Sequence, residues 1–335
     1  MSSQPIRRLT RRAASLGAAL AVLPLGLASL PASAQQAAWP NKPIRAVVPF
    51  AAGSATDQIG RAFGERMQAV LGQPVLIDNK PGANGMLGAD VVAKAPADGY
   101  TILIGTNSTN AALKYLMKKL PYDQDKDFVP VAYIGSVPLM VAVNPDVPAR
   151  TLKEFVALAK AKPGEASVAY ASTSKQVSSE MLASMAGVKF NMVPYKSGPA
   201  AMTDLIGGQV MAFTADFAVT VPQYKAGKIR GLAVTSTKRA AAVPELPTVN
   251  EVLGLKDYEL IAYFAVFAPA GTPPDVIARL NQAVNTAAAD KAVVDKFAAN
   301  GFSVEPGTPD DLARRNRAET AKWEKAIREA RIEAQ

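Results

Sequence analysis

Two amino acids are absent from the 335 residues: the chain has no cysteine and no histidine. Without cysteine there are no disulfides, so the fold has to rely on its core. Zinc sites of the usual kind are excluded, and so are Ser-His-Asp, Cys-His and other histidine-dependent catalysis. The composition still allows catalysis by carboxylates or lysine, but no GxSxG, Walker A or GxGxxG motif supports it. We therefore predict no enzyme, no metal and no cofactor.

Long apolar runs and dense blocks of positive charge are missing from the chain after residue 34. No run of about twenty apolar residues occurs there, so no transmembrane helix is predicted. No block of five or more Lys/Arg residues occurs either, which leaves nucleic-acid binding without support. The remaining positive charge either recruits an anionic solute or serves only solubility.

The first 34 residues have the pattern of a secretory signal peptide. Four arginines (Arg7, Arg8, Arg11 and Arg12) precede an apolar stretch at 16–30, and Ala32-Ser33-Ala34 supplies a small-x-small cleavage site. We predict cleavage after Ala34 and a periplasmic location, by the general secretory rather than the twin-arginine route. A membrane anchor is the alternative, and the short apolar stretch speaks against it. Removal of four arginines and no acid lowers the formal charge from +9 to +5.

From Pro43 onward, short apolar segments alternate with helical patterns. The first unit reads as strands at 44–48, 75–77 and 101–104, with helices at about 59–71 and 86–94 between them. The second reads as strands at 139–143, 168–170, 192–194, 210–213 and 232–234, with helices at 151–162, 178–186 and 199–206. Helices from Pro274 and at about 310–332 end the chain.

This order predicts an α/β protein of two lobes, each a mainly parallel sheet flanked by helices. Lobe 1 is predicted to be discontinuous, with residues 39–138 and 251–335, and lobe 2 to comprise 139–250. A cleft between two such lobes is the natural place for a ligand.

Ligands of parallel sheets bind beyond the carboxyl ends of the strands, so the loops after each strand are the candidates. The loop after the first strand leads straight into a helix N-terminus, where free N–H groups favour an anion. It consists of Phe50, Ala51, Ala52, Gly53, Ser54, Ala55, Thr56 and Asp57. An ordinary turn capped by Ser54, Thr56 or Asp57 is the alternative, and the spacing alone slightly favours it.

Candidate binding residues follow four other strands in the same way. Thr106 and Asn107 follow the third strand, and hydroxyl or amide groups there could bind a carboxylate. The corresponding positions of the second unit are Ser172, Thr173, Tyr195, Ser197, Gly198 and Asp216. Asp216 would receive a ligand amine or simply cap the next helix, and Tyr195 and Tyr263 would line the cleft or pack in the core.

Eight stretches in order resemble the Bug family, the extracytoplasmic binding proteins of tripartite tricarboxylate transporters. They are WPNKPI (39–44), VPF (48–50) with TD (56–57), DNKPGANG (78–85), ADGYT (97–101), LPYD (120–123), VPYK (193–196), DLIGG (204–208) and APAGTP (268–273). The resemblance covers residues 39–332. It implies a type II periplasmic-binding-protein fold whose lobes close on a di- or tricarboxylate, an acidic amino acid or an aromatic acid.

The resemblance also implies how the ligand is held: by backbone amides and ordered waters from residues 50–57 and from the loops named above. Three positions depart from the family pattern. Ser54 stands where a second glycine is usual, Tyr263 where a tryptophan is common, and the glycine-rich loop after Ser172 is shorter. Lys175 in that shorter loop could reach a second carboxylate.

The predicted partners are a small carboxylate and the membrane subunits of a tripartite tricarboxylate transporter, with the protein acting as a monomer. Presentation of the ligand to a sensor kinase is the alternative, and the sequence does not separate the two roles. An enzyme with carboxylate catalysis is the third reading, which the absent motifs disfavour.

Overall fold

The computed structural model describes residues 39–334, and the predicted signal peptide lies outside them. The first elements are β1 (Ile44–Val48), α1 (Ala55–Leu71), β2 (Val75–Asn79), η1 (Ala83–Gly85), α2 (Met86–Ala93) and β3 (Thr101–Thr106). Strand β1 pairs in parallel with β2 on one side and β3 on the other. This confirms the predicted parallel order of the first three strands.

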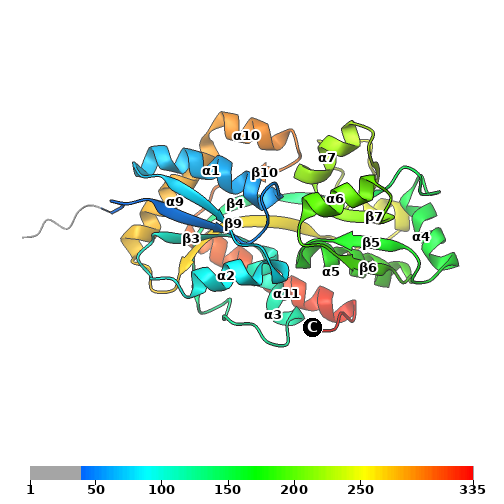
Figure 1. Cartoon of the computed structure of the whole chain (residues 1–335), viewed down its shortest axis with the longest axis horizontal. Coiled ribbons are helices and arrows are strands. Elements are labelled where there is room, and N and C mark those ends of the chain that lie inside the picture. The colour runs from blue at the N-terminus through cyan, green and yellow to red at the C-terminus, as the bar shows by residue number, and fades with distance from the viewer. Residues whose placement is uncertain (1–38, 335) are drawn as a thin grey trace, which may run out of the picture. The chain divides into compact units, whose positions relative to one another are not determined.

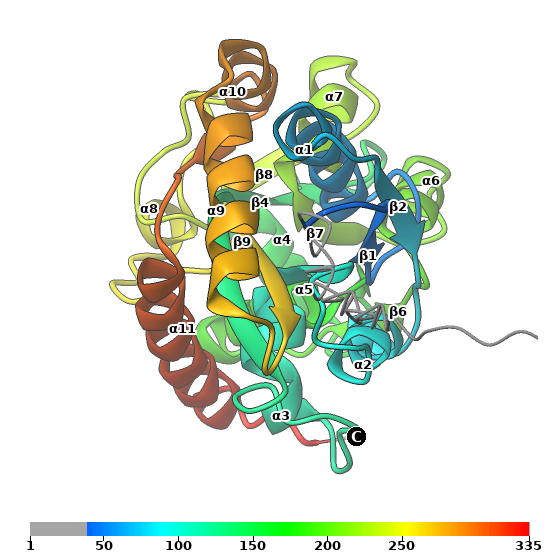
Figure 2. The ribbon, with the colours of Figure 1, turned by 90° about the vertical axis from the view of Figure 1, so that its left-hand side faces the viewer.

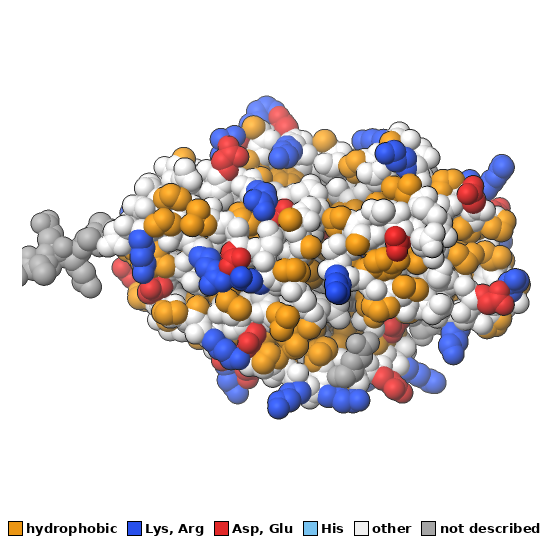
Figure 3. Space-filling view, viewed as in Figure 1, with side chains coloured by type: hydrophobic (Ala, Val, Ile, Leu, Met, Phe, Trp, Pro, Cys, Tyr) orange, Lys and Arg blue, Asp and Glu red, His pale blue; other side chains and the backbone are white. Residues whose placement is uncertain are grey.

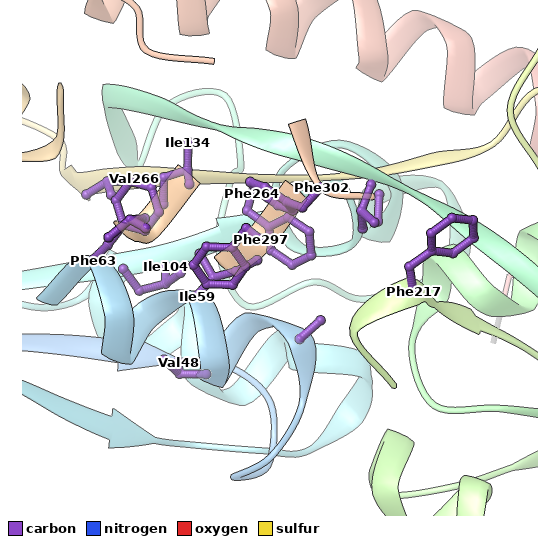
Figure 4. Packing of buried hydrophobic residues seen from close by; sticks show 14 of the residues in the cluster. Val48, Ile59, Phe63, Ile104, Ile134, Phe217, Phe264, Val266, Phe297 and Phe302 are labelled. Carbon is purple, nitrogen blue, oxygen red and sulfur yellow. The ribbon is translucent and has the colours of Figure 1, made fainter. Parts of the chain in front are cut away.

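Helix α1 illustrates how the sequence sets these elements. The hydroxyl of Ser54 caps its N-terminus by accepting the N–H of Asp57, and Gly72 ends it in a left-handed conformation at φ 69°. Ile59, Phe63 and Met67 recur at helical spacing on its buried face. In the core, Ile59 and Phe63 share one cluster with Phe264 of the later strand β9 (Ile261–Pro269) (Figure 4).

The first sheet is completed by two long strands, β4 (Phe128–Val143) and β9 (Ile261–Pro269), after the π-helical turn η2 (Ser108–Ala112) and α3 (Leu113–Leu116). Strand β9 lies between β3 and β4 and is antiparallel to both. The sequence predicted only the end of β4, at 139–143. The part before Leu139 carries Pro130 and Pro138, which lack an N–H, and its pairing is irregular at Pro130/Ala132 and Tyr133/Gly135.

Strand β4 joins two sheets. Residues up to Pro138 pair with β9, whereas Leu139–Val143 pair with β7 (Ala212–Asp216) and β8 (Arg230–Val234). The second sheet continues through β5 (Ser167–Tyr170) to β6 (Asn191–Pro194), and β5 is parallel to β6 and β7. Its helices are α4 (Leu152–Ala161), α5 (Thr173–Ala186), α6 (Gly198–Ile206), α7 (Phe217–Lys225) and α8 (Val249–Leu253).

The chain ends with α9 (Pro274–Ala289), α10 (Lys291–Ala298), β10 (Ser303–Val304) and α11 (Pro309–Glu329). Helices α1 and α9 cover one face of the first sheet, and α2 and α11 cover the other (Figure 1, Figure 2). On the face shown in Figure 3, acidic and basic side chains are interspersed rather than gathered by sign. None of the helices within residues 39–334 has the length and apolarity needed to cross a membrane.

Candidate functional site

The ends of strands from both sheets surround a cavity of about 30 Å³. Its walls include three groups of predicted residues from the first sheet: Phe50 and Ala51, then Ser54, Ala55 and Thr56, then Thr106 and Asn107. From the second sheet come Ser172, Ser197, Gly198 and Asp216. The other predicted residues, Ala52, Gly53, Asp57, Thr173 and Tyr195, do not line it.

The N-terminus of α1 gives the cavity two backbone donors. Ala55 and Thr56 occupy its first turn, where N–H groups have no partner in the helix itself. Both residues are buried and both line the cavity. The positive end of the helix dipole adds to the attraction for an anion at this place.

Asp57 does not face the cavity but holds the loop in front of it. Its carboxylate accepts the Gly53 N–H at 2.9 Å and the Asn79 side-chain amide at 3.0 Å, and it forms an ion pair with Arg61 at 3.0 Å. The Asn79 amide also donates to the Phe50 carbonyl, which ties both ends of the loop together. Burial raises the pKa of Asp57, but the bonds from Arg61, Gly53 and Asn79 outweigh it and hold the pKa below its usual value.

Replacing Asp57 by Asn is therefore expected to lower the free energy of unfolding by about 1 to 2 kcal/mol at neutral pH, because a buried charge-assisted network is lost. A lowered pKa in the folded state gives stability that is complete above the unfolded-state pKa, near 3.9, and is lost as the pH falls through the folded-state pKa. Urea unfolding from pH 6 down to pH 2 should show the difference between wild type and variant shrinking below about pH 4.

The matched control is Asp257→Asn, at an exposed position, which should change stability by less than about 0.5 kcal/mol. A stability difference for Asp57→Asn that stays constant down to pH 2 would contradict the role of the charged carboxylate.

Two cavity-lining residues at the end of β3 each carry a buried side-chain oxygen that has no hydrogen-bond partner among the described residues. Asn107 donates its amide N–H to the Ile261 carbonyl at 2.7 Å, and this fixes which end of the amide is oxygen. Its Oδ1 atom and the Thr106 hydroxyl are buried and have no hydrogen-bond partner among the described residues. An amide oxygen can only accept, so this wall favours a ligand or water that donates.

On the side of the second sheet, helix α5 begins five residues earlier than predicted. Thr173, Ser174 and Lys175 form its first turn, where the sequence had predicted a loop after Ser172. Small hydroxyl residues favour such N-terminal turns. Ser174 and Ser108 meet across the cavity, with the Ser174 N–H donating to Ser108 Oγ at 3.1 Å and the two Oγ atoms 3.3 Å apart.

Two of the predicted aromatic residues have structural contacts instead of lining the cavity. Tyr195 donates its hydroxyl to Asp204 at 2.6 Å, and burial together with this carboxylate raises its pKa to about 12. Tyr263 is buried and donates to Asn316. Thr173 is fully buried within α5 and also stays away from the cavity.

An ion pair between Lys175 and Asp216 forms part of the second-sheet wall. Lys175 Nζ lies 2.7 Å from Asp216 Oδ2, and the two side chains are 13% and 7% exposed. The other carboxylate oxygen, Oδ1, is buried without a hydrogen-bond partner among the described residues. All other side chains that line the cavity are neutral.

Sequence reasoning missed several residues of the lining. Ser108 and Ser174 lie next to predicted residues, whereas the apolar part of the wall comes from Ala171, Phe213, Ala215, Val219, Ala262 and Phe264. Phe213 and Ala215 alternate along β7, and Ala262 and Phe264 along β9. That alternation places each pair on one face of its strand. It is the sequence signal from which these lining residues could have been predicted.

The model of the tripartite tricarboxylate transporter family receptor, TctC, matches residues 59–332. The chain belongs to this family. Among TctC-family relatives it is 37% identical over 324 residues to the protein BugT of Bordetella pertussis, covering 96% of this chain and 98% of BugT. It is 38% identical over 300 residues to a UPF0065 protein from the tcbD-tcbE intergenic region of Pseudomonas sp. strain P51, covering 89% of each.

Solved structures give the same assignment. Rpa4515 of R. palustris with adipate has a TM-score of 0.85 and 34% identity, covering 89% of this chain and 100% of that one. MatC of Rhodopseudomonas palustris with bound malate has a TM-score of 0.82 and 32% identity, covering 86% and 99%. The periplasmic binding protein BugD has a TM-score of 0.85, 32% identity, and coverage of 89% and 100%. The two-lobed periplasmic-binding-protein fold and the predicted family are therefore confirmed, and the protein is a solute-binding protein of the TctC type.

Proposed function

We propose that this protein captures a small carboxylate in the cavity between its two sheets and delivers it to the membrane subunits of a tripartite tricarboxylate transporter. The observation that carries the proposal is the buried first turn of α1: Ala55 and Thr56 line the cavity, and their N–H groups have no partner within the helix. Its neighbours in the wall are hydroxyl, amide and apolar groups, which suit a small polar anion with a carbon skeleton.

The two lobes of this proposal are residues 39–138 with 251–335, and residues 139–250. Support comes from β4, which changes partners between Pro138 and Leu139. A cavity of about 30 Å³ holds on the order of two water molecules. Because residues of both lobes enclose the cavity, the lobes separate to admit the ligand and then close around it.

The proposal extends to location and to chemistry. We propose that the chain is exported to the periplasm with cleavage after Ala34, and that it acts there as a monomer. We also propose that the cavity binds its ligand without turnover, in keeping with the receptor family to which the chain belongs.

Isothermal titration calorimetry with a panel of carboxylates tests the proposal. The panel contains mono-, di- and tricarboxylates, both aliphatic and aromatic. At least one member is expected to bind the purified protein in a saturable one-to-one complex with a Kd at or below about 10 μM, or about −7 kcal/mol. If none of these compounds binds, capture of a small carboxylate is wrong.

A further inference from the structure

The strongest unexplained feature of the cavity is the Lys175–Asp216 ion pair. The two residues come from different elements, the first turn of α5 and the end of β7, and are brought together by the second sheet. Taking two charges out of water costs several kcal/mol unless the charges also satisfy other groups. Here one charge-bearing atom remains unsatisfied, since Asp216 Oδ1 has no hydrogen-bond partner among the described residues.

Both members of the pair line the cavity, and each keeps an unused hydrogen-bonding capacity. An ammonium carries three N–H donors, and one ion pair does not exhaust them, so Lys175 can still bind an anionic oxygen. A carboxylate oxygen can only accept, so Asp216 Oδ1 needs a donor. The cavity therefore presents a cationic donor and an anionic acceptor side by side.

A second buried acceptor, on the wall formed by the first sheet, also calls for a hydrogen-bond donor on the ligand. Asn107 Oδ1 is buried and unpartnered, and its amide N–H is already used by the Ile261 carbonyl. An unsubstituted carboxylate offers no donor to either Asn107 or Asp216.

We infer that Lys175 and Asp216 together recognise a carboxylate whose neighbouring carbon carries a hydroxyl or an ammonium group. Lys175 binds the carboxylate, and Asp216 Oδ1 accepts a hydrogen bond from the neighbouring substituent. The substrate class is thus the 2-hydroxy and 2-amino acids, as opposed to unsubstituted aliphatic acids. This inference deepens the proposed function and rests on it.

The test compares ligands that differ only in the substituent. Succinate, malate and aspartate form one such set, and propanoate, lactate and alanine form a second. Glutarate, 2-hydroxyglutarate and glutamate form a third. In each set that binds at all, calorimetry is expected to give the hydroxy or amino acid a Kd about 10-fold or more lower than that of the unsubstituted acid. The malate and aspartate arms tell which donor, hydroxyl or ammonium, the pair prefers.

The decisive variant removes both charges, Lys175→Met with Asp216→Ala. Replacing a buried ion pair by apolar side chains is often neutral for stability, whereas removing one partner leaves a buried unpaired charge. The double variant is expected to bind the acids of a set with Kd values within about threefold of one another. The control is Lys162→Met with Glu165→Ala, an exposed ion pair in the same lobe at 3.1 Å, which should keep the wild-type preference.

The outcomes separate this inference from the proposed function. If wild type binds carboxylates but prefers the unsubstituted acid, or if the double variant keeps the 10-fold preference, the role of the pair is wrong and carboxylate capture stands. If no compound of the three sets binds wild type and the wider panel also fails, both are wrong. Crystals of wild type grown with malate should place the malate hydroxyl within hydrogen-bond distance of Asp216, and a hydroxyl turned away from that carboxylate would overturn the inference.

Discussion

Replacing Ala51 by Trp is expected to weaken carboxylate binding by about 100-fold or more, which corresponds to about 2.7 kcal/mol. Ala51 lines the cavity and is only half-buried, so an indole can be accommodated there without disrupting the core. The ring then covers the space next to the first turn of α1, and the lobes cannot close on a ligand around it. Calorimetric titration with the best-binding carboxylate measures the loss.

Its neighbour Ala52 provides the matched control. Ala52 is exposed and does not line the cavity, although the sequence analysis predicted that both residues bind the ligand. Ala52→Trp should leave Kd within about twofold, and both variants should unfold in urea within about 0.5 kcal/mol of wild type. Equal, undiminished binding by both variants would mean that the ligand does not occupy this cavity.

A disulfide between positions 108 and 174 is expected to abolish ligand entry. Ser108 follows β3 and Ser174 lies in α5, so they belong to the two proposed lobes, and their Oγ atoms are 3.3 Å apart. The two side chains are thus in direct contact, and the chain has no native cysteine that could mispair with the engineered ones. With Ser108→Cys and Ser174→Cys oxidised, the lobes cannot separate, so association with the carboxylate should slow by about 100-fold or more.

Reduction of the same protein is the control, because it leaves both substitutions in place and releases only the cross-link. Stopped-flow association should recover on reduction, and protein oxidised after loading should retain its ligand through dialysis. If the oxidised protein takes up ligand as fast as the reduced one, the ligand reaches its site without separation of the lobes.

The fold was largely predictable because its information is local. Apolar segments such as Ile44–Val48 and the helical spacing of Ile59, Phe63 and Met67 specify elements without reference to distant parts of the chain. The part of β4 before Leu139 could not be predicted from such local patterns. Pro130, Gly135 and Pro138 interrupt its pattern, and only pairing with β9, more than a hundred residues later, makes it a strand.

The site was predictable as a set of loops but not as a set of side-chain directions. Strand ends locate the segment 50–57, yet Ala51 and Ser54 line the cavity while Ala52 and Gly53 do not. Asp57 looked like a ligand-binding group and instead holds the loop. Lys175 and Asp216 were each noted in the sequence, but their contact depends on the packing of α5 against β7.

A crystal structure with the carboxylate that binds most tightly in calorimetry tests the central claim most directly. We predict that a carboxylate oxygen of the ligand accepts from the N–H groups of Ala55 and Thr56, with the two sheets closed around the molecule. A ligand bound anywhere else on the protein, with the first turn of α1 facing only water, would contradict it.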